Sequence, residues 1–413
     1  MDSQESSKNL KFVYFTPADI QVARVDRQCI VYFCEALHNL RVDIELIAMG
    51  IRTFDFEAKA NNPLDLYRIK KRFPVRIVKT YLHQESSSYW GVMNRIWVHT
   101  KEAVRVLNSA ESGKTIVFYS KNYASAFAHL SLRLLSRKRV LVVFEAHLLP
   151  KNAFQRFVLR NVDFIIANSF ALGKDLCKEN PLWRGKVMGI HQGVDLTLFN
   201  ELRISKIEAR KKIGLPLNKK LAVYTGKVYW GYAEVDYILK AAELLSHDVE
   251  VVIVGGRKDH VDRFREHVLK NNISNVRFVG FVPPNHVQYY QFAADVLLLY
   301  YPTGIDLNSY RSPGKLFEYM ASGRPIISVD FPVLREVLDV AGIYVPPDSP
   351  DLLAQAISQI LVDEKKAEAL AERALSLAEN YTWEERARRI LQFIEGKSPR
   401  QCSRLGSTDS ISL

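Results

Sequence analysis

The sequence has few of the features that would mark several common classes of protein. Its four cysteines among 413 residues lack the paired spacing of a zinc site, and no other cluster of metal-ligating residues is visible. No apolar stretch approaches the ~20 residues that span a bilayer. The N-terminus also lacks the charged-then-apolar pattern of a secretory signal. We therefore expect a cytoplasmic protein without a metal site.

A glycine-rich dinucleotide loop is also missing. The first strand-like run leads into the segment 15–19 (Phe-Thr-Pro-Ala-Asp), which contains no glycine. A dinucleotide-binding domain would need Gly-x-Gly-x-x-Gly at this point, because the loop must let the backbone approach a pyrophosphate closely. This argues against a dinucleotide-dependent oxidoreductase.

Positive charge is concentrated in the first half of the chain. The net charge is +12, and residues 1–195 carry 29 Lys and Arg against 18 Asp and Glu. The densest stretch is 68–79, and aromatic residues lie in and near it at Phe73, Tyr81, Tyr89, Trp90 and Trp97. Such a mixture suits an anionic membrane surface or a polyanionic acceptor, and a solvated basic face fits equally well. No nucleic-acid motif accompanies the charge.

Strand-like and helix-like runs alternate along the whole chain, which predicts parallel sheets. The expected strands are 11–15, 44–49, 116–119, 140–144 and 164–167, then 221–225, 249–254, 276–278, 296–300, 325–329 and 343–345. We predict an α/β fold of two Rossmann-like, doubly wound domains facing a cleft, at 1–200 and 201–380. A helix at 381–396 is expected to return to the first domain. The polar tail 397–413 is expected to be disordered.

The most informative segment is Ser312–Pro325. It predicts a loop to Pro313, a short helix from Lys315 to Ala321, a stop at Gly323 and a strand after it. The first amides of a helix bind anions, Lys315 adds a full charge, and Glu318 lies one turn further on. Phosphates at the helix start and ribose hydroxyls on the carboxylate would suit a nucleotide sugar. An ordinary helix with an ion pair between positions i and i+3 is the alternative.

The wording of this segment, SPGKLFEYMASGRPII, closely resembles the donor-binding helix of the group 1 glycosyltransferases, which are retaining enzymes of the GT-B fold. The resemblance implies a nucleoside-diphosphate sugar as donor substrate and no further cofactor. It assigns donor binding to Ser312, Pro313, Gly314, Lys315, Leu316 and Glu318.

Other segments also resemble the family. Gly193-Val194-Asp195 with Phe199 matches a signature at the end of the first domain, with Gln192 in place of the usual Asn. The run 140–150 is similar to the family's strand and Glu-x-His-Asp element, with Leu148 in place of the Asp, and implies that His147 lies near the donor sugar. The segment 161–169 matches the next strand, and we expect it to serve packing. The strand 223–227 implies that Gly226 and Lys227 meet the diphosphate. Residues 279–283 match a later strand of the family, which implies that backbone atoms near Phe281 and Val282 meet the base.

Two departures from the family concern the donor. The stretch 228–234 lacks the second basic residue that members often have, so Lys227 and Lys315 are the charge partners we can name. Members also often carry a glutamate eight positions before Glu318, where this chain has Tyr310. Asp306 and Asn308 are candidates to replace it.

These features together give the expected activity. We expect a metal-independent, retaining glycosyltransferase with His147, Lys227, Lys315 and Glu318 as catalytic residues. Its acceptor would be a lipid-linked or polysaccharide glycan, contacted by Asp19, Arg24 and Trp90, and the protein would dock on the inner face of an anionic membrane. Alternatives are a catalytically silent nucleotide-sugar-binding subunit, a transferase for a small soluble metabolite, and another GT-B enzyme such as an epimerase or phosphorylase.

Overall fold

The computed structural model describes residues 9–22, 24–51, 62–80, 89–231, 233–284 and 286–396. The chain forms two compact units, one from residues 1–191 and 383–413 and the other from residues 192–382. The tail 397–413, expected to be disordered, and Tyr81 lie outside the described residues.

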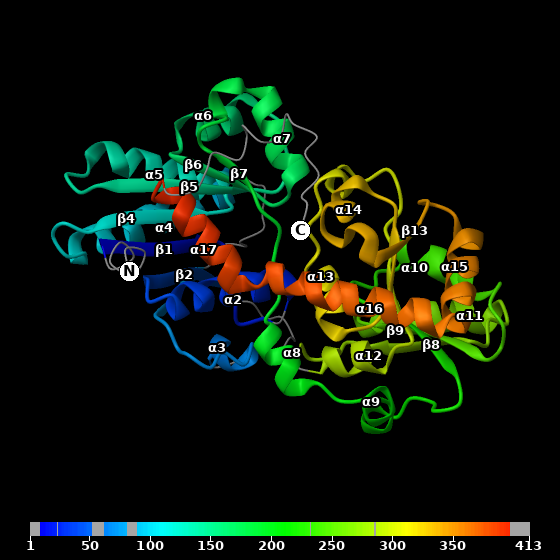
Figure 1. The fold of residues 1–413 in the computed structure, drawn as a ribbon. Coiled ribbons are helices and arrows are strands. Elements are labelled where there is room, and N and C mark those ends of the chain that lie inside the picture. Colours follow the sequence, from blue (N-terminus) through cyan, green and yellow to red (C-terminus); the bar gives the residue numbers. More distant parts are fainter. Residues whose placement is uncertain are drawn as a thin grey trace. The chain divides into compact units, whose positions relative to one another are not determined.

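The first unit is built on a seven-stranded sheet in the order β3-β2-β1-β4-β5-β6-β7 (Figure 1). Every pairing between neighbours is parallel. Because parallel strands need crossover connections, helices separate most of them along the chain. The strands are β1 (Leu10–Thr16), β2 (Asp43–Ile51), β3 (Val75–Thr80), β4 (Thr115–Ser120), β5 (Val140–Ala146), β6 (Phe164–Ala167) and β7 (Val187–Gly189).

Helices cover both faces of this sheet, so its central strands are buried on both sides. Phe12 and Phe15 of β1 are both fully buried although their side chains point to opposite faces. The helices are α2 (Val25–Asn39), α3 (Pro63–Leu66), α4 (Tyr89–Ser109), α5 (Tyr123–Leu135), α6 (Ala153–Asn161), α7 (Phe170–Glu179), the 3-10 turn η2 (Pro181–Trp183) and α17 (Trp383–Ile394).

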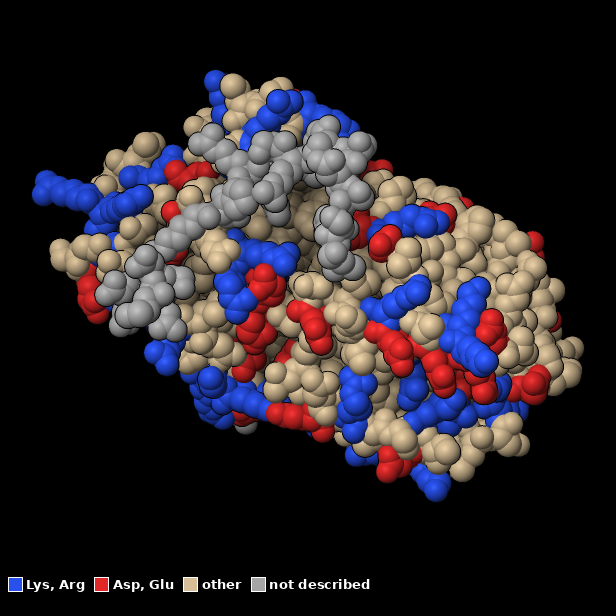
Figure 2. Space-filling view, in the orientation of Figure 1, with Lys and Arg blue, Asp and Glu red and all other residues tan. Residues whose placement is uncertain are grey.

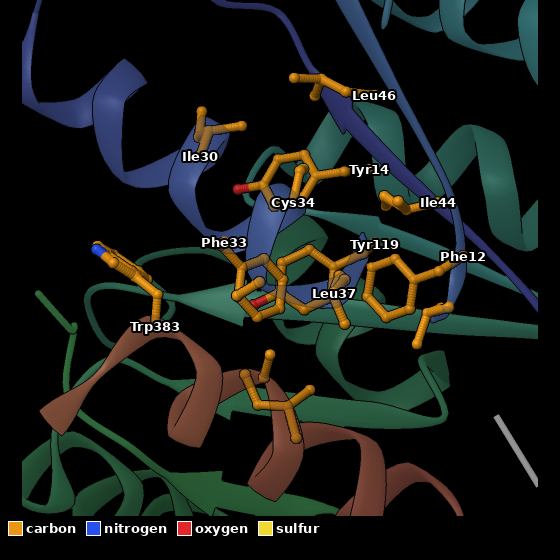
Figure 3. Close-up of a cluster of buried hydrophobic side chains, with 14 of the residues drawn as sticks. Phe12, Tyr14, Ile30, Phe33, Cys34, Leu37, Ile44, Leu46, Tyr119 and Trp383 are labelled. Atoms are coloured by element: carbon orange, nitrogen blue, oxygen red, sulfur yellow. The ribbon is translucent and has the colours of Figure 1, made fainter. Parts of the chain in front are cut away.

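One face of the sheet packs an aromatic core against α2 and α17 (Figure 3). The rings of Phe12, Tyr14 and Phe33 all contact Tyr119, with centroids 5.0–5.6 Å apart. Trp383 lies at the edge of this cluster, where its ring is 6.4 Å from that of Tyr32. The C-terminal helix α17 is thereby part of the first unit, although 191 residues of the second unit precede it in the chain.

The second unit has a six-stranded parallel sheet in the order β10-β9-β8-β11-β12-β13. Its strands are short, and the four central ones are almost wholly buried, as is typical of a sheet covered on both faces. They are β8 (Lys220–Thr225), β9 (Val249–Val254), β10 (Val276–Gly280), β11 (Val296–Leu299), β12 (Ile326–Val329) and β13 (Gly342–Val345).

The helices of the second unit fall before, between and after these strands. Figure 2 shows acidic and basic side chains interspersed where α16 runs, in keeping with the nearly balanced charge of the later half of the chain. The elements are α8 (Leu196–Leu202), α9 (Lys206–Ile213), α10 (Ala233–Ala242), α11 (Lys258–Lys270), α12 (Val287–Ala293), η3 (Asp306–Ser309), α13 (Gly314–Ser322), α14 (Pro332–Leu338), η4 (Asp339–Ala341), α15 (Pro350–Val362), α16 (Glu364–Ala378) and η5 (Glu379–Tyr381).

The prediction of two doubly wound parallel sheets is confirmed. Two strands were missed. One is β3, an edge strand in which Arg76 and Lys79 interrupt the apolar pattern, and the other is the three-residue β7. Helix α4 begins at Tyr89, and its first turns carry exposed aromatic residues. Within the described ranges, no helix is both long and apolar enough to cross a membrane.

Candidate functional site

The predicted donor-binding helix is α13, and its N-terminus offers free amides. The helix begins at Gly314 after Pro313, ends at Gly323 in the left-handed conformation, and no side chain caps its first turn. The hydroxyl of Ser312 accepts a hydrogen bond from the backbone N–H of Gln192 at 2.9 Å. The predicted boundaries are therefore right to within a residue at each end, and the helix start has the orphan donors that bind anions.

Lys315 extends from the first turn of α13 over two tyrosine rings. Its Nζ lies 4.0 Å from the ring centroid of Tyr224 and 5.1 Å from that of Tyr301. Burial lowers its pKa to about 8, and the attraction of Glu234 only partly offsets this effect. Lys315 and Glu318 form no ion pair, which contradicts the alternative of an ordinary i, i+3 pair. Among the described residues, Lys315 has cation–π contacts but no carboxylate within ion-pair distance.

Glycines at the ends of two neighbouring strands make room for this lysine. A Cβ atom at Gly226, just after β8, would lie 2.7 Å from Lys315 Nζ. At Gly255, just after β9, φ is +123° and a Cβ atom would lie 1.9 Å from the carbonyl oxygen of Gly226. Only glycine fits such a close approach between backbones. The Gly-Lys and Gly-Gly pairs of the sequence therefore shape the edge of the sheet next to α13.

Glu318 faces α12. Its Oε2 accepts a hydrogen bond of 3.0 Å from Nε2 of Gln291. Burial raises the pKa of the carboxyl, and the hydrogen bond from Gln291 and the charge of Lys315 oppose that shift. The contact with Gln291 was not predicted, because a glutamine in an apolar helix does not indicate which residue it will bond to. One Glu318 oxygen is thus held in place by protein.

Tyr319 ties α13 to the end of β8. Its hydroxyl accepts hydrogen bonds from the backbone N–H of Thr225 at 2.8 Å and from its Oγ1 at 3.2 Å. Both residues are buried. At the other end of the helix, Arg203 donates to the carbonyl of Ala321 at 2.9 Å. These two attachments bring the first turn of α13 next to Gly226, and neither was predicted from the sequence.

The other predicted donor residues lie at the same edge of the sheet. Lys227 is exposed and close enough to lower the pKa of Lys315 by its charge. Phe281 follows β10 and is 64% exposed, and Val282 is half-buried beside it. Leu316, by contrast, is fully buried, so its side chain packs in the core and only its backbone can meet a ligand.

The loop before α13 contains the two candidates to replace the glutamate that is missing at position 310. Asp306 is exposed, and Tyr310 is half-buried. Asn308 is buried, and its Nδ2 donates to the carbonyl of Pro302 within the same loop. The candidate Asn308 therefore braces the loop, which leaves Asp306 as the acidic residue of this stretch.

The first unit holds a separate buried cluster at the carboxyl ends of β4, β5 and β6. Glu145 is 2% exposed, and its Oε1 lies 3.3 Å from Nζ of Lys121 and 3.3 Å from Nη2 of Arg386. The hydroxyl of Tyr119 donates to its other oxygen. Burial alone would raise the pKa of Glu145, but the two positive charges and a hydrogen bond from His147 hold it well below its usual range.

His147 is fixed at both ring nitrogens. Nδ1 accepts from Nδ2 of Asn168 at 3.1 Å, so the proton is on Nε2, which lies 3.1 Å from Oε1 of Glu145. Burial lowers the pKa of the imidazole, as do the charges of Lys121 and Arg386, and the ring is neutral at pH 7. The segment 161–169 was expected to serve packing, and that interpretation is incomplete because Asn168 positions this ring. Arg386 comes from α17, too far along the chain for the sequence to connect.

The three predicted acceptor-side residues occupy different settings in the first unit. Asp19 is buried, and its Oδ1 accepts from the backbone N–H of Gln21 at 3.1 Å. Arg24 is the exposed N-cap residue of α2. Trp90 is 71% exposed on α4. Their role toward an acceptor stays a prediction.

Across the residues that the structure describes, no group of three or more His, Cys, Asp or Glu side chains could hold a metal ion.

Comparisons with known proteins agree with the predicted family. Residues 219–363 match the model of the family Glycosyl transferases group 1. A D-inositol 3-phosphate glycosyltransferase of Corynebacterium aurimucosum is 24% identical over 54% of this chain and 54% of its own length. TuaH of Bacillus subtilis, named for teichuronic acid biosynthesis, is 22% identical over 91% of each chain.

Solved structures bear on the fold. Anabaena HepE, crystallised with UDP and glucose, superposes with a TM-score of 0.68 at 14% identity, covering 93% of this chain and 99% of its own. The predicted GT-B fold is thereby confirmed. This chain spans about half the length of the first curated relatives that it matches.

Proposed function

We propose that this chain is a group 1 glycosyltransferase and that it transfers a sugar from a nucleoside-diphosphate sugar to an acceptor hydroxyl. One observation carries the proposal: within the described residues, Lys315 holds a half-buried positive charge with no carboxylate at ion-pair distance, beside the uncapped start of α13. Such a charge is costly unless a ligand supplies the anion. A diphosphate bound there would bring the nucleoside toward Glu318 and Phe281.

The chemistry follows from where charge develops. The bond between the anomeric carbon and the diphosphate oxygen breaks, and its electron pair leaves with the nucleoside diphosphate. The acceptor oxygen bonds to the same carbon and loses its proton. Lys315, Lys227 and the first amides of α13 stabilise the departing charge more in the transition state than in the ground state. These cations would serve in place of a divalent metal, and retention of configuration rests on the family resemblance.

In the first unit, His147 acts as a neutral, oriented imidazole. Its Nε2–H donates a hydrogen bond to Oε1 of Glu145, which keeps the ring in one tautomer and one orientation. A neutral histidine adds no positive charge to the reaction. Asn168→Ala should therefore lower turnover with little effect on donor affinity.

A donor screen tests the proposal. Thermal shift with UDP-, GDP- and ADP-sugars identifies the nucleotide, and HepE's complex with UDP and glucose favours trying the UDP series first. The donor that stabilises the protein is then supplied with a labelled sugar. Release or transfer of the label is the expected result. Stabilisation by none of the donors would contradict the proposal.

A silent nucleotide-sugar-binding subunit is the second candidate, and the tyrosine at position 310 favours it. Members of the family often have a glutamate there, which lies by the transferred sugar. The same labelled donor separates the two functions, because a silent subunit would bind it and release nothing. Tyr310→Glu would then be the matched variant. If this variant gains hydrolysis of the donor, the wild type is a silent subunit.

For the acceptor we favour a lipid-linked or polysaccharide glycan. TuaH, a relative over most of its length, is named for the synthesis of a polysaccharide, teichuronic acid. The D-inositol 3-phosphate glycosyltransferases are named for a small soluble acceptor, which keeps that alternative in the test. Offering the labelled donor with inositol phosphate, and separately with a membrane lipid extract, distinguishes the two.

The first unit presents a surface suited to an anionic membrane. Trp90 and Trp97 of α4 are 71% and 69% exposed, and they lie two helical turns apart on one face. A shallow pocket of about 350 Å³ between α4 and β3 is lined by Lys79, Trp97 and Lys101, among others. Exposed indole rings beside lysines are typical of protein surfaces that settle at the headgroup level. We place peripheral docking on the inner face of the membrane here.

Vesicle binding tests this surface. We expect the protein to bind anionic vesicles and not neutral ones, and to dissociate as salt rises, because the attraction is screened within ~10 Å at 0.1 M. Replacing Trp90 and Trp97 by serine should weaken binding. Leu134→Ser, at an 82% exposed residue of α5, is the matched control. Equal binding to both vesicle types, or none, would leave a soluble acceptor as the better interpretation.

A further inference from the structure

Arg311 lies in the loop between η3 and α13, two residues before Pro313, and its donors are not fully used. Its side chain is 20% exposed, and its nearest carboxylate, Glu234, is 3.7 Å from Nη1, beyond hydrogen-bond distance. Its Nε is buried and has no acceptor within the described part of the chain. Buried donors usually have a partner, so this Nε is open to an acceptor supplied by a ligand.

The guanidinium is positioned by an aromatic ring that it shares with Lys315. Its Cζ lies 4.0 Å from the ring centroid of Tyr301, and Nζ of Lys315 lies 5.1 Å from the same centroid. The charge of Arg311 lowers the pKa of Lys315, as two neighbouring cations should affect each other. Two positive groups therefore converge on one point of the second unit.

The charges around this point do not balance. Lys315, Arg311 and Lys227 face Glu234 and Glu318, and neither carboxylate is free to neutralise the cations fully. Glu234 also accepts a hydrogen bond of 2.9 Å from the hydroxyl of Tyr224, while Glu318 is bonded to Gln291. The three cations exceed the two carboxylates by one charge, and a bound diphosphate would offset that excess.

We propose that Arg311 is a third diphosphate-binding residue, in addition to Lys315 and Lys227. A guanidinium can bind two phosphate oxygens at once, whereas a lysine acts as a point charge, so Arg311 fixes the orientation of the diphosphate. It supplies the second basic group that the stretch 228–234 lacks. Glu234 holds the guanidinium near its bound position in the absence of donor. This inference rests on the proposed function.

Binding measured by calorimetry tests the assignment with UDP, GDP and ADP and with the matching nucleosides. For the diphosphate that the wild type binds, Arg311→Gln should reduce affinity by at least tenfold and leave nucleoside affinity within twofold. Arg311→Lys should fall between, since it keeps the charge and loses the fork. Arg373→Gln, at an exposed position of α16, is the control and should bind as the wild type does.

The outcomes separate this inference from the proposed function. If the wild type binds none of the three diphosphates, the proposed function fails and the role of Arg311 falls with it. If the wild type binds one and Arg311→Gln binds it within threefold, only Arg311 is misassigned. Equal losses for diphosphate and nucleoside would make Arg311 a structural brace, which also overturns the inference. Should Arg311→Gln not fold, the same comparison is made with Arg311→Lys, for which a threefold loss confined to the diphosphate is expected.

Discussion

Lys315 should make donor binding depend on pH in a range where most lysines do not titrate. Its pKa is lowered to about 8 by burial. Below that value the ammonium is charged and binds a diphosphate. At pH 9 only about one molecule in ten carries the charge, so affinity should fall roughly tenfold between pH 7 and pH 9. The phosphate itself contributes little to this change, because its second ionisation is complete above about pH 7.

The same residue should reduce the stability of the free protein. A lowering of the pKa from 10.5 to about 8 corresponds to about 3 kcal/mol against the charged form at neutral pH. Because Lys315 is only half-buried, solvent screening reduces the expected cost to about 1–3 kcal/mol. Lys315→Met should therefore raise the melting temperature while it weakens diphosphate binding. Opposite signs for stability and binding are the signature of a residue kept for function.

The assay is calorimetric titration of the wild type, Lys315→Arg and Lys315→Met with the preferred nucleoside diphosphate from pH 7 to pH 9.5. Lys315→Arg should bind without the loss above pH 8, since arginine stays charged. In turnover, Lys315→Ala and Lys227→Ala should each lower kcat more than they raise KM. A flat pH profile for the wild type, or a lower melting temperature for Lys315→Met with unchanged binding, would refute the reasoning.

Two further predictions concern the framework of each unit. Tyr319→Phe should cost about 1–3 kcal/mol, because the buried N–H of Thr225 loses its acceptor, and it should weaken donor binding by loosening α13; unchanged urea unfolding would contradict this. In the first unit, burial lowers the pKa of His99 to about 3 and that of His129 well below its usual range. Both rings are therefore neutral in the folded protein, and the free energy of unfolding should be highest above about pH 6.5 and fall as the pH drops toward 3. His129→Leu should make the melting temperature less sensitive to acid between pH 6.5 and pH 4.5, and an unaltered acid dependence would show that this ring does not titrate on unfolding.

Most of the second unit was predicted from the sequence because the residue pattern of each element agrees with the fold as a whole. The helix from Lys315 to Ala321 has a proline before it and a left-handed glycine after it, and both ends match α13. Strand β3 was missed because it lies at the edge of the sheet, where a strand needs little apolar surface. Arg76 and Lys79 therefore interrupt the alternation of apolar and polar residues that would have indicated a strand.

The contacts that assemble the candidate site could not be predicted, since they join residues far apart in the chain. Arg386 lies 241 positions from Glu145, and no local pattern links them. The bond of Tyr319 to Thr225 likewise spans 94 residues. A buried arginine in a helix indicates that a carboxylate lies near it, but the sequence does not identify that carboxylate. Position in the sheet, known only from the fold, selects the partner.

The central claim is that Glu318 holds the ribose of a nucleotide-sugar donor. The most direct measurement compares the wild type and Glu318→Ala with the donor that the thermal-shift screen selects, by affinity for its nucleoside and by transfer of its labelled sugar. We expect the variant to fold normally, to lose about 1.5–3 kcal/mol of nucleoside binding and to lose transfer in proportion. Wild-type affinity and wild-type transfer in Glu318→Ala would contradict the account.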